Sequence, residues 1–167
     1  MIEDIIEWRH HFHQNPELEF DTLNTAKKVA SLLQAFGLQV HENIGKTGVV
    51  GVLSRGQSSK AIGLRADMDA LPIDEQNSFK HRSQVKGKMH ACGHDGHMSM
   101  LLGAACTLSQ SPTFDGTVYF IFQPNEERGF GAQAMIDDGL FERFPMQAVY
   151  GMHNMPGLEA GNISLRA

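Results

Sequence analysis

The chain has 167 residues, enough to bury a core and to form one domain. Hydrophobic residues make up 41% of it and charged residues 20%, as in ordinary globular proteins. The net charge is −5 and the lysines and arginines are scattered, which argues against nucleic acid or an anionic membrane as a partner. No apolar run reaches the roughly 18 residues of a membrane helix. The acidic, amphipathic start is unlike a secretory signal, so we expect a cytoplasmic protein.

The N-terminal part predicts two helices followed by three short strands. A stripe of apolar residues at helical spacing predicts the first helix, which Asn15-Pro16 ends. The second helix is expected from about Thr22 to Phe36, with Gly37 as its C-cap. Glycine and serine turns then separate β-like runs at residues 38–41, 48–53 and 61–66.

The C-terminal part alternates helical and buried-strand patterns after a polar, irregular loop at residues 67–89. The run TVYFIF is apolar on both faces, as expected of a central buried strand. Helices on both faces of a mixed sheet, and hence an α/β fold, follow from this alternation. The expected elements are helices at residues 95–108 and 131–138 and strands at 117–122, 148–152 and from 163.

The densest group of metal-binding residue types precedes the helix at residues 95–108. Three of the nine histidines, His90, His94 and His97, crowd around Cys92. In an extended segment residues i and i+2 point to the same side, so Cys92 and His94 can converge on one ion. A thiolate with an imidazole suits zinc or another borderline transition metal. The alternative is a buried cysteine beside polar residues that cap a helix, and we expect His97 to have a structural or ligand-supporting role.

Other polar clusters also follow strands. Glu126 and Glu127 come directly after the buried strand, at the sheet edge where α/β proteins place ligands. Neighbouring side chains diverge, so one glutamate can bind metal while the other serves as general base; the alternative is a solvated acidic turn. His153 follows another apolar strand, and Asp67 and Asp69 either orient a ligating histidine or cap a loop. Together the clusters predict a metal site.

Five segments of the chain resemble the metal-dependent amidohydrolases that include hippurate hydrolase, N-acetyldiaminopimelate deacetylase and the indole-acetyl-amino acid hydrolases, relatives of aminoacylase and carboxypeptidase G. The segments are RHHFHQNPELEF, GLRADMDALPI, MHACGHDGHMSMLLGAA, FIFQPNEERGFGAQAMIDDGLFE and YGMHNMPGLEAGNI. The resemblance implies a three-layer αβα domain with a mixed, mostly parallel central sheet, like that of zinc exopeptidases. Residues 1–167 would be the N-terminal part of the catalytic domain. A lid and dimerisation domain, and a C-terminal segment with a last metal-ligand histidine, would be absent.

The resemblance also implies residue roles. Cys92, His94, Glu127 and His153 would bind two divalent metal ions, with the cysteine bridging them, and Glu126 would be the general base. The ions would be zinc, manganese, cobalt or nickel. The substrates would be small N-acyl amino acids whose amide bond is hydrolysed, and the full-length form could be a homodimer.

Other positions are read against the family pattern. Asp69 lies where more distant relatives keep an orienting aspartate, and Asp67 where those relatives have a metal-binding histidine, so both are expected to support ligands. The residues of RHHFHQNPELEF are interpreted as structural. Asn125, Arg128 and Phe130 depart from the alanine and glycine-rich residues of the family, which bears on substrate preference more than on metal binding.

Two other functions compete with hydrolysis. A truncated chain would bind metal without competent turnover, since it lacks one expected ligand and the lid. A non-catalytic α/β module would instead hold a single structural zinc in a closed site. Metal stoichiometry distinguishes the second alternative, and hydrolysis of hippurate or N-acetyl amino acids distinguishes the first.

Overall fold

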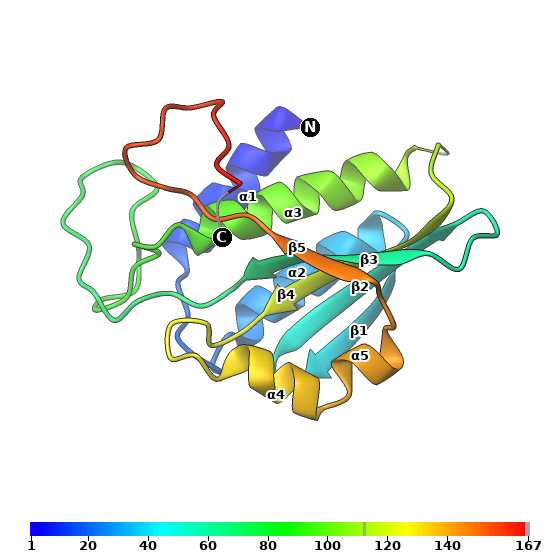
Figure 1. Cartoon of the computed structure of the whole chain (residues 1–167). Helices are drawn as coiled ribbons and strands as arrows, with labels where there is room; N and C mark the ends of the chain where they lie inside the picture. Colours follow the sequence, from blue (N-terminus) through cyan, green and yellow to red (C-terminus); the bar gives the residue numbers. More distant parts are fainter. Residues whose placement is uncertain (112, 166–167) are drawn as a thin grey trace.

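A five-stranded sheet lies between two layers of helices in the computed structural model, which describes residues 1–111 and 113–165 (Figure 1). The strand order is β1-β2-β4-β3-β5. Strand β2 pairs antiparallel with β1 and β4, whereas β3 pairs parallel with β4 and β5. The sheet is therefore mixed, and β2 alone runs against the direction of the other strands. The strands are β1 (Gln39–Ile44), β2 (Gly48–Arg55), β3 (Ala61–Asp67), β4 (Gly116–Gln123) and β5 (Ala148–Gly151).

Helices cover both faces of the sheet. Alternate residues of β4 enter two separate cores: Phe120 and Phe122 pack with α1, α2 and α3, whereas Ile121 packs with α4 and α5. Because β4 is covered on both faces, all of these side chains are buried, as the apolar run predicted. The three-layer αβα fold is confirmed. The helices are α1 (Ile2–Gln14), α2 (Leu23–Ala35), α3 (His94–Ser109), α4 (Gly131–Asp137) and α5 (Leu140–Arg143).

Two details differ from the sequence-based expectation. Helix α5 was not predicted, because its four residues are too few to show a helical period. The strand expected from Ile163 is wrong: the described residues 163–165 lie outside any strand, with Ile163 74% and Leu165 97% exposed. A β-like run forms a strand only where another strand pairs with it, and here none of the described strands does.

The parallel strands position the candidate site. Strands β3, β4 and β5 run in the same direction, so the segments that follow them emerge at one edge of the sheet. Asp67 at the end of β3 pairs in register with Gln123 at the end of β4. Helix α3 begins over the same edge, after Gly93, whose φ of 93° is accessible mainly to glycine. Among the described residues, no helix is long and apolar enough to cross a membrane.

Candidate metal centre

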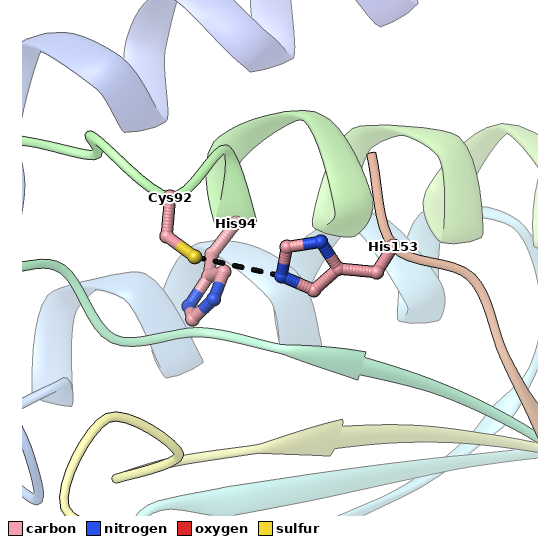
Figure 2. A group of neighbouring side chains, drawn as sticks. All are labelled: Cys92, His94 and His153. Atoms are coloured by element: carbon pink, nitrogen blue, oxygen red, sulfur yellow. Dashed lines mark hydrogen bonds between the residues drawn. The ribbon is translucent and has the colours of Figure 1, made fainter. Parts of the chain in front are cut away.

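Cys92, His94 and His153 converge at this edge, as Figure 2 shows. Their potential ligand atoms all lie within 4.8 Å of one another. The Sγ atom of Cys92 lies 3.4 Å from Nε2 of His153. Around a tetrahedral zinc ion, a thiolate sulfur at ~2.3 Å and an imidazole nitrogen at ~2.0 Å would lie roughly 3.5 Å apart. The spacing of these two atoms therefore fits a shared ion.

Both histidines present the same nitrogen to the site. Nδ1 of His94 lies 2.7 Å from the backbone carbonyl oxygen of Asp69, and Nδ1 of His153 lies 2.7 Å from that of Asn154. A carbonyl oxygen only accepts hydrogen bonds, so each Nδ1 carries the proton and each Nε2 keeps its lone pair. Metal-binding histidines are commonly fixed in this way. Nε2 of His94 is also buried without a hydrogen-bond partner.

Carboxylates surround the lone pair of His94. Its Nε2 atom lies 3.6 Å from Oδ2 of Asp67 and 3.7 Å from both Oε2 of Glu126 and Oε1 of Glu127. The Glu127 oxygen is itself buried without a partner. Acceptor atoms facing one another in a buried site are unfavourable unless a cation lies between them. These residues therefore fit a divalent metal ion by charge, by donor type and by spacing.

The thiol of Cys92 also needs a cation in order to ionise. Burial, and then the nearby charges of Glu127 and Glu126, raise its pKa to about 11. Only the thiolate is a good metal ligand, so binding of a divalent ion to Cys92 would displace a proton.

Asp69 connects the two segments that carry these groups. Its buried carboxylate accepts the backbone N–H of Glu126 at 2.8 Å and that of Glu127 at 3.1 Å. Its carbonyl oxygen fixes His94, whereas its Oδ1 atom is 3.9 Å from the same ring. Asp69 thus orients a histidine, as one of the two sequence-based readings proposed, but through its backbone. Its carboxylate instead holds the turn after β4.

Asp67 lies beside the ligands and is held as an anion. Its carboxylate accepts a hydrogen bond from Nδ1 of His97 at 2.7 Å and another from Nη1 of Arg65 at 2.7 Å. Burial alone would raise the pKa of Asp67, but these partners and His94 lower it to about 2. The hydrogen bond and charge of Asp67 likewise outweigh burial and raise the pKa of His97.

The remaining histidine of the motif, His90, does not join the ligands. It is buried, both of its ring nitrogens lack a partner, and burial lowers its pKa to about 4. It belongs to none of the possible metal-binding groups found among the described residues. His90 is therefore a neutral ring in the protein interior.

A buried network that the sequence did not reveal supports the start of α3. His13 of α1 contacts Oδ2 of Asp95 through Nδ1 at 2.9 Å and Oε1 of Glu75 through Nε2 at 3.0 Å. It thereby joins α1, α3 and the loop that follows β3. The structural reading of RHHFHQNPELEF agrees with this placement of His13. The partners were missed because they lie 82 and 62 residues away in the sequence.

Replacing His13 with asparagine is expected to lower the free energy of unfolding by about 3 kcal/mol, because it removes a charged partner that Asp95 and Glu75 share in a buried network. Asp95 and then Glu75 raise the pKa of His13 from 6.5, so the ion pair is complete below pH 6.5 and weakens as pH rises through the raised value. His13 lowers the pKa of Asp95 from 3.8 although burial opposes it, so the pair is lost as pH falls through that lower value.

The stability difference should therefore be largest at about pH 5 to 6.5 and smaller at about pH 9. Urea unfolding in the presence of a chelator measures it without a contribution from metal. His11→Asn is the matched control, since the His11 ring forms no hydrogen bond within the described chain. A difference that grows from pH 6 to about pH 9 would contradict the assignment of a charged His13.

Comparisons with known proteins agree with this geometry. The family model for peptidase family M20/M25/M40 matches residues 63–167. The hippurate hydrolase of Campylobacter jejuni is 57% identical over 148 residues, which cover 89% of this chain and 38% of that protein. The Arabidopsis thaliana IAA-amino acid hydrolase ILR1-like 5 is 41% identical over 169 residues, covering 98% of this chain and 38% of that protein.

Solved structures give the same result. The crystal structure of the Bacillus subtilis YXEP protein, a dinuclear metal binding peptidase from the M20 family, superposes with a TM-score of 0.88 at 39% identity. The match covers 93% of this chain and 44% of that one. The chain spans about two-fifths of the length of the curated relatives named here. With this family match over most of its length, the chain belongs to peptidase family M20/M25/M40, a family of metal-dependent hydrolases.

Proposed function

We propose that this chain provides the catalytic metal centre of a hydrolase that cleaves the amide bond of small N-acyl amino acids. The observation that carries the proposal is the buried, unpartnered Nε2 of His94, surrounded by Cys92, His153 and the paired glutamates. The names of the similar proteins, hippurate hydrolase and IAA-amino acid hydrolase, supply the substrate class. A cytoplasmic location and a homodimer of a longer form stay predictions.

The proposed ligands are Cys92, His94, Glu127 and His153, and they would hold two divalent ions, zinc, manganese, cobalt or nickel. Bound ions would supply Lewis-acid activation of water and of the scissile carbonyl. Burial supports the different roles of the glutamates. The side chain of Glu127 is 21% exposed with one buried, unpartnered oxygen, as suits a ligand. That of Glu126 is 39% exposed and can reach a substrate from the solvent side.

Glu126 would move the protons of the reaction. Its carboxylate accepts a proton from the attacking water as the new C–O bond forms, and then donates that proton to the departing amine as the C–N bond breaks. With hippurate the products are benzoate and glycine. Asp69 supports this role because its carboxylate accepts hydrogen bonds from the backbone N–H groups of both glutamates. These bonds fix the backbone from which the two side chains extend.

Metal counting combined with an assay of hippurate hydrolysis tests the proposal. We expect two zinc or manganese ions per chain, release of glycine from hippurate, loss of that activity with a chelator, and recovery when metal is returned. One tightly held ion without hydrolysis would indicate a structural site instead. Two ions without hydrolysis of hippurate or N-acetyl amino acids would support the alternative function, metal binding without turnover.

A further inference from the structure

His97 is a buried residue beside the site that the proposed mechanism does not use. Its side chain is 2% exposed and both ring nitrogens are occupied. Nδ1 lies 2.7 Å from Oδ1 of Asp67, and Nε2 lies 2.6 Å from the side-chain oxygen of Asn154. Asp67, His94 and His97 together could surround an ion, but His97 would first have to give up one of these partners. Its contacts instead lead to the segment that follows β5.

Asn154 connects His97 to His153. Its backbone nitrogen lies 3.2 Å from Nε2 of His97, and its carbonyl oxygen accepts the hydrogen bond from Nδ1 of His153 at 2.7 Å. The rings of His97 and His153 also meet edge to face, with their centroids 4.6 Å apart. His153 itself is exposed, so its position depends strongly on these contacts.

The start of α3 is shaped to receive Asn154. The segment after β5 runs back past the first turn of α3 (Figure 1). A Cβ atom built on Gly93 would lie only 2.4 Å from Oδ1 of Asn154. The glycine between Cys92 and His94 therefore leaves the space in which this side chain reaches His97. The segment that supplies the proposed ligands Cys92 and His94 therefore also contacts Asn154, the residue next to the proposed ligand His153.

We propose that His97 is a positioning residue, which holds His153 ready to bind metal by anchoring Asn154 to the buried start of α3. The proposal rests on the proposed function in one respect, that His153 is a ligand. Without the anchor, the ion itself would have to order an exposed segment, and part of the binding free energy would be lost. Loss of a group that orients a ligand typically lowers metal affinity about 10–100-fold.

A double-mutant cycle on the whole chain tests this coupling, with Co²⁺ affinity measured by chelator competition and by absorption. Asn154→Ala removes the side-chain contact to His97 but keeps the backbone N–H that lies near the same ring and the carbonyl that fixes His153. We expect it to weaken Co²⁺ binding about tenfold while the thiolate–cobalt absorption of Cys92 remains. In the His153→Ala background, the same substitution should change the affinity by less than about twofold. His97→Asn should repeat this pattern, whereas Met155→Ala, an exposed neighbour, should have no effect.

The outcomes separate the two proposals. A tenfold loss from Asn154→Ala in both backgrounds would overturn the positioning role, because the residue would then act independently of His153. Unchanged affinity in His153→Ala would overturn both His153 as a ligand and the role of His97, while leaving Cys92 and His94 as ligands. A wild-type chain that binds no Co²⁺ would contradict the proposed function as well.

Discussion

Replacing Glu126 with glutamine is expected to leave the metal content unchanged and to lower kcat for hippurate hydrolysis by about 10²–10⁴-fold. The amide has nearly the same shape as the carboxylate but cannot accept a proton from water at neutral pH. The backbone should stay in place, since Asp69 accepts the N–H of residue 126 whatever its side chain. The measurement is steady-state hydrolysis alongside metal analysis of the same sample.

Two matched variants make this result specific. Glu42→Gln, at an exposed position of β1, makes the same chemical change away from the site and should retain full activity. Glu127→Gln should lose metal as well as activity. Retained turnover in Glu126→Gln would rule it out as the general base. Loss of metal in Glu126→Gln with metal kept in Glu127→Gln would show that the two roles are exchanged.

Local sequence patterns account for most of the secondary structure. Helical spacing of apolar residues predicted α1, α2 and α3 to within a few residues, and the doubly apolar run predicted β4. The same patterns do not contain the strand order β1-β2-β4-β3-β5 or the reversed direction of β2. Those features depend on which strands pair over long sequence separations, and hydrophobic period carries no information about a partner.

The candidate site likewise contains residues that local sequence patterns could predict and contacts that they could not. Cys92 and His94 are two residues apart, so a local argument could bring them to one ion. His153 lies 61 residues beyond Cys92. Its place after an apolar strand grouped it with the other clusters, and the family resemblance identified it as a ligand. The supporting contacts were out of reach of both arguments. That Asp69 uses its carbonyl for His94 and its carboxylate for the glutamates depends on backbone geometry, which residue type does not specify.

The second large effect is expected from His94→Ala, which should remove most of the bound metal. His94 is the residue common to all three groups of potential ligands found in the described chain: one with Cys92 and His153, one with Asp67 and His97, and one with the paired glutamates. An ion placed in any of them would lose a nitrogen ligand. Inductively coupled plasma analysis after dialysis against zinc measures the content, and circular dichroism checks that the variant is folded.

His11→Ala, an exposed histidine of α1, is the control for losing one imidazole, and it should keep the wild-type metal content. An unchanged metal content in a folded His94→Ala variant would mean that the ion binds elsewhere than at this edge of the sheet, and would contradict the whole proposed ligand set. A large loss in both variants would instead point to nonspecific binding by histidines.

The pH dependence of metal affinity in Cys92→Ser is expected to show how much the Cys92 thiolate contributes to binding, apart from the histidines. The pKa of the Cys92 thiol, raised to about 11 by burial and by Glu127, means that binding must displace its proton throughout the neutral range. Below that pKa, each unit of rising pH should therefore strengthen metal binding about tenfold through this residue alone. Between about pH 7.5 and 9 the wild-type affinity should therefore still rise, whereas that of Cys92→Ser should rise much less, because serine has no thiol proton to displace. Parallel slopes for the two proteins would show that the ion does not bind the sulfur.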